Sequence, residues 1–378
     1  MSGKPFKRGK RWCAVVEREP DPTTGRRRQR WIYGATKKEV ELAITRHLHA
    51  RDTGTDLDPT TMTTGVYLEH WLVTAIKPHL RQGTHERYAQ AVRSHLAPRL
   101  GEIPLRKLNA LHLSRAYADL REAGLSASTV ALDHTVLHAA LKQAVAWQLI
   151  AANCADSVQR PRGETKEFPL WDVETAARFE GAIAEEEFGT LFIVAIRTGL
   201  RRGELLGLRW ANIHLDRGYL TVAESRVKVA GGVKVEAPKG HRSRQIELST
   251  EEVALLRTHR ERQERARERA DEAWVGGDHV FTMPDGRPVT PSTYGRRWHA
   301  LLIKVGVPAI RPHDLRHLNI SLLLEEGHNV KVVQQRAGHH SAAFTLDRYG
   351  HALEGGRRRA AGAVGGALAR ARGATDSI

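Results

Sequence analysis

Two adjacent arginines near residue 200 have the type and position expected of a phosphate-binding bend. Arg201 and Arg202 follow an apolar run and Gly199, and a further apolar run begins shortly afterwards. Glycine at this place is expected to end one helix just before another begins, and a helix N-terminus favours an anion through its N–H groups and dipole. A phosphate could bind here, although a lone arginine at a bend more often forms only a surface salt bridge.

A histidine and an arginine with helical spacing form a second candidate. His313 and Arg316 stand at the start of an apolar helix, and a separation of three residues places both side chains on the same side of it. A proton-transfer group and a fixed cation would then face one point. The pattern H-x-x-R often arises by chance or for structural reasons, so it carries weight only together with other segments.

The third candidate is a tyrosine that follows a pair of histidines. His339 and His340 precede Tyr349 by about three helical turns or less. A tyrosine hydroxyl can act as a covalent nucleophile once it loses its proton, whereas a tyrosine on an apolar helix face is more often part of the core. The order of the three segments, rather than any one of them, indicates a catalytic site.

The chain as a whole is strongly basic. Its 378 residues include 59 Lys plus Arg against 43 Asp plus Glu, a formal net charge of +16. This excess favours a polyanionic partner, nucleic acid first and an anionic membrane surface second. Charge alone is equally compatible with a soluble protein that merely has a basic surface.

Cysteine content and the N-terminal residues indicate a cytoplasmic protein. Cys13 and Cys154 are too few and too far apart for a zinc site or a disulfide framework. The basic N-terminus has no apolar core followed by a cleavage site, and no later run approaches the ~20 apolar residues of a membrane-spanning helix. We therefore expect no membrane partner.

The first 52 residues are predicted to form a small sheet with one helix. Residues 11–17 and 26–33 have the composition of strands, and Thr36 with Glu39 forms a capping box at the start of a helix. Four arginines of the second strand are candidate DNA-phosphate contacts: Arg26, Arg27, Arg28 and Arg30. The interleaved aromatic residues are expected to anchor this strand, and a solvated, charged edge strand is the competing interpretation.

Helical periodicity dominates the rest of the chain. Linkers are predicted at 52–64 and 153–168. Between them, four helices are predicted at 66–76, 84–96, 110–123 and 128–148. The largest region follows, mostly helical but with three short strands at 219–223, 226–229 and 244–248. Gly231 and Gly232 are expected to form a turn between the later strands. Ser249 and Glu252 are expected to cap a long helix whose Arg and Glu run is a solvated, ion-paired face.

Taken in order, these segments resemble the catalytic domain of tyrosine recombinases, the family of phage integrases and chromosome-dimer resolvases. TGLRRGELLGLRW (198–210) resembles the first box of the family, and PKGHRSRQIEL (238–248) resembles its strand-borne lysine region. HDLRH (313–317) resembles the second box, and AGHHSAAFTLDRY (337–349) resembles the third box with the nucleophile. Separated matches in the same order make coincidence improbable.

By position, the resemblance implies a complete catalytic set. Its members are Arg201, Lys239, His313, Arg316, His339 and the nucleophile Tyr349, with Glu204 as a supporting carboxylate. The family pattern selects Arg201 over Arg202 and His339 over His340. The chain departs from the pattern at Ala337, where leucine is usual.

The resemblance also implies a mechanism. The two arginines and His339 would hold the phosphate oxygens, His313 would take the proton of Tyr349, and Lys239 would protonate the leaving 5′ oxygen. The 3′-phosphotyrosine conserves the energy of the broken linkage, so ATP is not needed. The sequence contains neither a G-x-x-x-x-G-K-[ST] loop nor a cluster with metal-ligand spacing, and we expect no cofactor and no metal.

The implied fold is mainly α with small β-sheets (α+β) in several domains. We expect a small sheet-plus-helix arm-binding domain at 1–55, a helical core-binding domain at 62–155, and a mixed catalytic domain at 168–378 that includes a C-terminal tail. The tail could dock on a neighbouring protomer or remain a frayed basic end.

The implied function is that of a DNA integrase of a bacterial mobile element. Expected partners are double-stranded DNA attachment sites, three further protomers in a tetramer, and an excision or host accessory factor, all at the nucleoid in the cytoplasm. The competing functions are a type IB topoisomerase, which shares the chemistry, and a noncatalytic DNA-binding regulator on the same fold. A metal-dependent transposase or nuclease ranks last, because no carboxylate constellation is evident.

Overall fold

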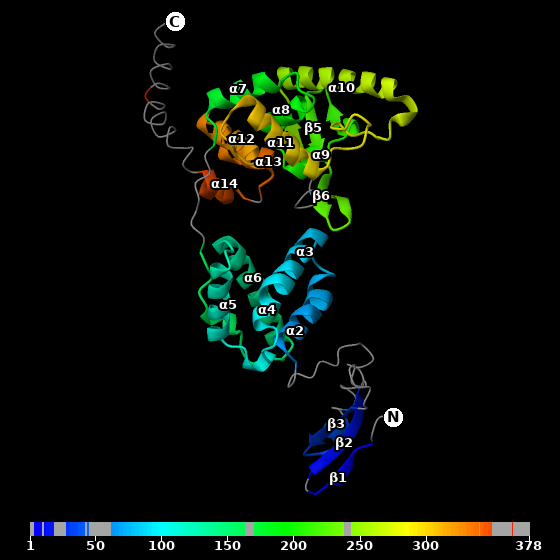
Figure 1. The fold of residues 1–378 in the computed structure, drawn as a ribbon, viewed down its shortest axis with the longest axis vertical. Coiled ribbons are helices and arrows are strands. Elements are labelled where there is room, and N and C mark those ends of the chain that lie inside the picture. The colour runs from blue at the N-terminus through cyan, green and yellow to red at the C-terminus, as the bar shows by residue number, and fades with distance from the viewer. Residues whose placement is uncertain are drawn as a thin grey trace, which may run out of the picture. The chain divides into compact units, whose positions relative to one another are not determined.

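The computed structural model describes residues 4–9, 11–18, 28–41, 44, 62–162, 170–237, 243–339, 341–349 and 365. The chain divides into two compact units, residues 1–164 and 165–378. Most described elements are helices, and the strands form small sheets (Figure 1). The expected mainly helical α+β fold is confirmed, whereas the further division of the first unit into two domains stays a prediction. No helix among the described residues is long and apolar enough to cross a bilayer.

The N-terminal residues form an antiparallel sheet in the order β1-β2-β3. Its strands are β1 (Phe6–Arg8), β2 (Arg11–Arg18) and β3 (Arg28–Gly34). The last two were predicted, but β1 is too short to show any periodicity. One half of the expected capping box is present, because the Glu39 N–H donates to Thr36 Oγ1 at 3.2 Å; the Glu39 Oε2 atom accepts from the N–H of Ala35, the residue before Thr36, at 2.9 Å. The helix that begins here packs Val40 and Ile44 onto one face of the sheet.

The aromatic residues of β3 lie on the other face of this sheet. Trp31 and Tyr33 are 41% and 57% exposed, and their rings stack at a centroid distance of 6.1 Å. Phe6 meets Trp31 edge-on, and the Arg8 guanidinium lies 5.2 Å from the Trp31 ring. Trp31 and Tyr33 therefore pack on a half-exposed face of the sheet, and their role as anchors of the strand stays a prediction. Strand alternation gives the core face to Ile32 instead.

Helices fold the rest of the first unit into a bundle, and the four predicted helices are confirmed. They are α2 (Thr64–Trp71), α3 (Gln82–Gln90), α5 (Ala110–Glu122) and α6 (Ala127–Ala146), and the short helix α4 (Ala97–Leu100) is additional. Two π-helical stretches, Leu72–Ile76 and Ala91–Leu96, continue α2 and join α3 to α4. Side chains of Thr63, Asn109 and Ser126 cap α2, α5 and α6, which explains why these helices begin where the sequence predicted.

The bundle buries a carboxyl group that is hydrogen-bonded to a histidine. The Asp133 side chain is fully buried, and His95 Nδ1 lies 2.9 Å from its Oδ2 atom. Burial raises the pKa of Asp133, and the hydrogen bond from His95 opposes that rise. The pair therefore ties α6 to the π-helical stretch that contains His95.

The second unit is built around α8, which is apolar on nearly every side. All residues of α8 (Gly189–Thr198) except Arg197 are buried, and α8 packs against α7 (Val173–Ile183), α10 (Thr250–Ala270) and α12 (Asp314–Glu325) (Figure 1). The other helices are α9 (Arg202–Leu206), α11 (Pro291–Val305), α13 (Val330–Ala337) and α14 (Ala342–Tyr349). The continuous apolar run of α8 thus makes it the central helix of this unit.

Two small sheets lie beside these helices. β4 (Ile213–His214), β5 (Tyr219–Val222) and β8 (Arg244–Glu247) form one sheet in the order β4-β5-β8. β6 (Ser225–Val229) and β7 (Gly232–Glu236) form a separate hairpin. The predicted turn contains two glycines with positive φ, Gly231 at 87° and Gly232 at 142°, but it joins β6 to β7, a strand that the sequence did not predict.

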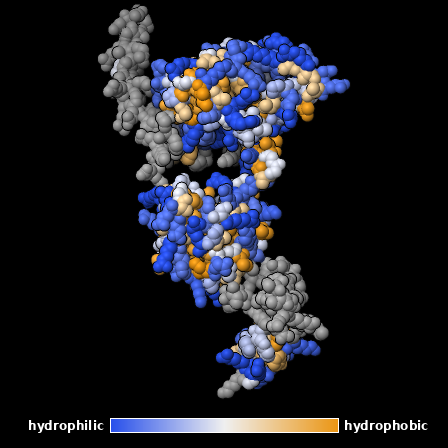
Figure 2. Space-filling model, viewed as in Figure 1, coloured by the Kyte–Doolittle hydropathy of each residue, from blue (hydrophilic) through white to orange (hydrophobic). Residues whose placement is uncertain are grey.

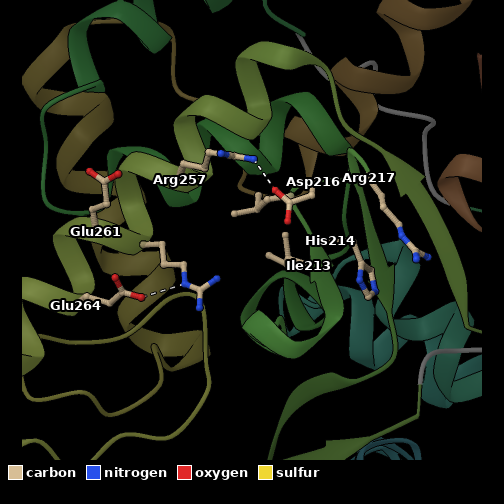
Figure 3. Close-up of a pocket in the computed structure, with 9 residues that line it drawn as sticks. Ile213, His214, Asp216, Arg217, Arg257, Glu261 and Glu264 are labelled. Atoms are coloured by element: carbon tan, nitrogen blue, oxygen red, sulfur yellow. Dashed lines mark hydrogen bonds and ion pairs between the residues drawn. The ribbon is translucent and has the colours of Figure 1, made fainter.

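The charged helix α10 has the solvated, ion-paired face that its sequence predicted. Arg257 pairs with Asp216 at 2.8 Å and Arg260 with Glu264 at 3.0 Å. These side chains line a surface pocket of ≈ 450 Å³ between α10 and the turn after β4 (Figure 3). Hydrophilic residues also prevail on the face of this unit seen in Figure 2. No candidate catalytic residue lines this pocket.

Candidate active site

The first candidate arginine lies where one helix ends and the next begins, as predicted. Gly199 ends α8 with φ 62°, and Arg201 immediately precedes α9. Arg201 Nη1 donates to Glu204 Oε1 at 2.9 Å, and Nη2 donates to the Gly338 carbonyl at 2.8 Å. Arg202 is exposed. The structure therefore places Arg201 and not Arg202 against the third sequence box.

Glu204 is a buried carboxylate held between two arginines. It is 1% exposed, and Arg244 donates to both of its oxygens, from Nη1 at 3.0 Å and from Nη2 at 2.7 Å. Burial alone would raise the pKa of Glu204, but the hydrogen bonds and charge of Arg244, together with the charge of Arg201, lower it to about 2. Glu204 is therefore ionised at neutral pH and fixes both guanidinium groups.

Sequence reasoning did not single out Arg244. It begins β8, and its Nε donates to the Arg336 carbonyl at 3.0 Å, so it joins Glu204 to the end of α13. A β-carbon on Gly338 would lie 3.1 Å from the Arg244 guanidinium carbon, which shows how closely the two segments approach. The available signal was indirect: a buried carboxylate in the first box needs a cationic partner, but nothing in the spacing identifies which arginine supplies it.

The second candidate arginine, Arg316, is held by backbone carbonyls. It is 3% exposed, and it donates to the Gly199 carbonyl at 2.7 Å and to the Ala337 carbonyl. Burial and the nearby charge of Arg201 lower the pKa of Arg316 to about 9, so its guanidinium remains protonated at neutral pH. Two fixed cations thus converge on the ends of α8 and α13.

His313 lies on the arginine side of the site. It immediately precedes α12, and Arg311 anchors that helix start through two bonds of 2.8 Å to Asp314, one from its backbone N–H and one from Nη2. Burial lowers the pKa of His313, and the charge of Arg316 lowers it further. His313 is therefore neutral at neutral pH, which suits a group that accepts or donates one hydrogen bond beside a phosphate.

His339 follows the glycine that ends α13. Gly338 has φ 66°, and His339 is 9% exposed with its Nδ1 atom 2.9 Å from Thr345 Oγ1. Its ring stacks on the Tyr349 ring at a centroid distance of 6.2 Å and an interplanar angle of 11°. The structure thus places His339 beside the candidate nucleophile, whereas His340 lies outside the described residues.

Tyr349 is the last residue of α14, and it is buried. It is 3% exposed and packs in a small cluster with Ile320, Leu324, Val333 and Ala337. Its hydroxyl is hydrogen-bonded to Nδ1 of His317. His317 is the last residue of the HDLRH motif, and no role was predicted for it from the sequence. Its contact with Tyr349 depends on how α12 and α14 pack together.

Three of the remaining candidates lie outside the described residues: Lys239, Arg26 and Arg27. Arg28 and Arg30 belong to β3, but their side chains are not described. The roles predicted for these five residues therefore stay predictions. The arginines, histidines and tyrosine that are described share one site, whose fixed positive charge beside a hydroxyl can stabilise a phosphate under attack. In the described part of the chain, no group of His, Cys, Asp or Glu is arranged to hold a metal ion.

Comparison with known proteins agrees with this geometry. Residues 182–355 match the phage integrase family, and residues 63–121 match the phage integrase N-terminal SAM-like domain. A tyrosine recombinase XerC-like protein of Caldanaerobacter subterraneus subsp. tengcongensis is 25% identical over 92% of this chain and 94% of its own. The ICEBs1 integrase of Bacillus subtilis is 27% identical over 88% of this chain and 90% of its own.

Solved structures with the same fold include DNA complexes of integrases. The Tn1549 transposon integrase with transposon right end DNA has a TM-score of 0.68 at 22% identity, covering 79% of this chain and 98% of that one. A lambda integrase tetramer bound to a Holliday junction has a TM-score of 0.58 at 18% identity, covering 90% of this chain and 94% of that one. With both family models and relatives along nearly its whole length in agreement, the chain belongs to the phage integrase family of tyrosine recombinases.

Proposed function

We propose that this site-specific recombinase is the integrase of a bacterial mobile element, which it inserts into and excises from DNA. It cleaves and rejoins strands through a 3′-phosphotyrosyl bond to Tyr349. One observation carries the proposal: the Tyr349 ring stacks on the His339 ring in the site where Arg201 and Arg316 are held, and Tyr349 lies close enough to Arg316 for their charges to interact. An attacking hydroxyl next to fixed positive charge is what cleavage of a phosphodiester requires.

The two arginines stabilise the transition state. A phosphodiester repels nucleophiles, and attack concentrates more negative charge on its nonbridging oxygens. Guanidinium groups stay charged and can donate parallel hydrogen bonds to two such oxygens. Because Arg201 and Arg316 are already oriented by backbone carbonyls and by Glu204, little reorganisation is needed when DNA binds. His313 and His339 add hydrogen-bonding atoms to the site.

The covalent step exchanges one phosphate ester for another. Tyr349 Oη forms a bond to phosphorus and loses its proton, and the bond from phosphorus to the 5′ oxygen breaks. Lys239 protonates that leaving oxygen as a general acid. The phosphotyrosyl bond keeps the energy of the broken linkage, so a 5′ hydroxyl of another strand can reverse the step. The reaction proceeds without ATP, metal or another cofactor.

The expected assembly is a tetramer on two duplexes, since recombination joins two attachment sites. The lambda integrase tetramer bound to a Holliday junction supports this assembly by analogy. Residues 1–55, 62–155 and 168–378 serve as arm-binding, core-binding and catalytic domains. Arg26, Arg27, Arg28 and Arg30 hold arm-site phosphates. An excision or host factor sets the direction, and the complex acts at the nucleoid in the cytoplasm.

A suicide-substrate experiment tests the proposal. Nicked duplexes tiled across the DNA that flanks the gene are incubated with the full-length wild type or with Tyr349→Phe, without metal or ATP. A covalent protein–DNA adduct from the wild type alone is expected. Tight binding without an adduct would instead indicate a noncatalytic regulator. Relaxation of a supercoiled plasmid that lacks the flanking DNA, at the same rate as one that contains it, would indicate a topoisomerase.

A further inference from the structure

The hydroxyl of Tyr349 and the imidazole of His317 form a pair that the family resemblance did not assign. His317 Nδ1 and Tyr349 Oη are hydrogen-bonded, and their ring centroids are 5.5 Å apart. We propose that His317, and not His313, is the catalytic base that takes the proton of Tyr349 during cleavage. The proposal rests on the proposed function, because it presupposes that Tyr349 attacks DNA.

The two histidines of α12 face different parts of the site. His313 and His317 are one helical turn apart, and their rings meet edge-on at a centroid distance of 5.2 Å and an angle of 85°. His313 lies close enough to Arg316 and Arg201 for their charges to lower its pKa. His317 instead meets the nucleophile. His313 is thereby placed to hydrogen-bond a phosphate oxygen near the arginines, and His317 to receive a proton from Tyr349.

The packing of Tyr349 fixes this contact. Its ring lies between the His317 and His339 rings, at centroid distances of 5.5 Å and 6.2 Å, and is buried against Ile320, Leu324 and Val333. Ile320 and Leu324 lie on α12, the helix that carries His317. Helix α12 therefore both packs against the Tyr349 ring and carries the hydrogen-bond partner of its hydroxyl.

The proton balance is simple. A neutral imidazole with its hydrogen on Nε2 has a lone pair on Nδ1, which can accept the phenolic proton. As Tyr349 Oη bonds to phosphorus, the proton moves from Oη to Nδ1, and the 5′ oxygen leaves with a proton from Lys239. In the rejoining step the 5′ hydroxyl attacks, the phosphotyrosyl bond breaks, and His317 returns its proton to Oη.

A carboxylate close to His317 favours the charged imidazole that this step produces. Asp314 lies three residues earlier on α12 and is 2% exposed. Burial raises the pKa of Asp314, but its bonds with Arg311 and, more weakly, the charge of His317 lower it overall. The Asp314 carboxylate therefore stays ionised, and its charge favours the imidazolium of His317 from a distance while its oxygens are bonded to Arg311.

Two substitutions at His317 separate proton transfer from positioning. His317→Asn puts an amide close to the position of Nδ1, so it can still hydrogen-bond Tyr349 but cannot take the proton. His317→Ala removes both capacities. His313→Asn is the matched control on the same helix. Each variant is prepared as the full chain with either tyrosine or the more acidic 3,5-difluorotyrosine at position 349, and single-turnover adduct formation is measured on the nicked duplexes.

We expect His317→Asn and His317→Ala to slow adduct formation by ~10²–10⁴-fold, the usual contribution of a general base. Difluorotyrosine should restore most of the lost rate in both, because a more acidic phenol needs less help in losing its proton. It should not restore the rate of His313→Asn. DNA affinity measured on the same samples reports whether each variant is folded.

Three results would overturn the assignment. If His317→Asn forms adduct as fast as the wild type, His317 only positions the hydroxyl. If its rate is low and difluorotyrosine does not raise it, the defect is not one of proton transfer. If difluorotyrosine rescues His313→Asn instead, His313 is the base. Failure of the wild type itself to form an adduct would overturn the proposed function, and is distinct from all three.

Discussion

Replacing Arg244 by methionine removes one of the two arginines that hold Glu204 while keeping a side chain of similar length. The pKa of the Glu204 carboxyl falls from its ordinary value of 4.5 to about 2, and Arg244 is the main cause of that fall. At about 1.4 kcal/mol for each unit of pKa, the interactions of the ionised carboxylate contribute about 3 kcal/mol. Loss of one partner of a buried ion pair typically costs about 3–5 kcal/mol, which is consistent. We therefore expect Arg244→Met to destabilise the second unit by about 3 kcal/mol.

Hydrogen exchange of the full chain measures this effect unit by unit. In the Arg244→Met variant, the slowest amides of α8 and α12 should exchange about 10²-fold faster, since 1.4 kcal/mol corresponds to a factor of ten. The bundle of α2 to α6 provides an internal control whose exchange should not change. Glu204→Gln in the same background should recover much of the loss, because it removes the buried charge that has lost a partner.

The pH dependence gives an independent check. Because the folded-state pKa of Glu204 lies below the unfolded value, its stabilising contribution is complete above about pH 4.5 and is lost as the pH falls toward 2. Glu204→Gln should therefore flatten the stability of the second unit over that range. Unchanged exchange of α8 in Arg244→Met, or an equal loss of protection in the bundle, would refute the reasoning.

Three further substitutions test local geometry. His95→Ala should destabilise the bundle by about 1–3 kcal/mol in urea unfolding, because it leaves buried Asp133 without that hydrogen bond. The folded-state pKa of Asp133 is raised, so its contribution to stability falls as the pH rises above the ordinary value of 3.8, and the defect should be smaller at pH 4 than at pH 7. Gly199→Ala places a β-carbon 2.5 Å from Asn319 Oδ1 at φ 62°, and should lower the melting temperature of the second unit in calorimetry. Gly338→Ala has φ 66° and approaches the Arg244 guanidinium at 3.1 Å, so it should slow adduct formation at saturating DNA. Unchanged melting or adduct rates would contradict the strain assigned to these glycines.

Elements with local signals were predictable from the sequence. The capping residues Ser126 and Ser249 and the apolar face of α6 depend on neighbours within a few residues, and these helices begin where predicted. Strand β7 was missed although Val233, Lys234, Val235 and Glu236 alternate between apolar and polar; its side chains are all exposed or half-buried. Its partner β6 is also mostly half-buried. The glycine turn after β6 was predicted correctly, but it was expected to lead to β8 and leads to β7 instead.

The site was predictable only as far as its motifs extend. Arg201, Arg316 and Tyr349 were found through the order of the boxes, and the structure brings them together. Arg244 and His317 were not found, because each matters through a contact between segments that are distant in sequence: Arg244 meets Glu204 across 40 residues, and His317 meets Tyr349 across 32. Spacing along one helix says which residues share a side, but not which distant group they will meet.

The way the arginines are held explains why the site can bind an anion at all. Arg316 donates to the carbonyls of Gly199 and Ala337, and Arg201 donates to that of Gly338. These carbonyls lie at the C-terminal ends of α8 and α13, where the helix dipole is negative and favours a cation without cancelling its full charge. Had carboxylates held both guanidinium groups, the site would be close to neutral and would have little attraction for phosphate. With one carboxylate among three arginines, an excess of positive charge remains for the phosphodiester, and the left-handed glycines that expose these carbonyls are therefore part of the electrostatic design of the site.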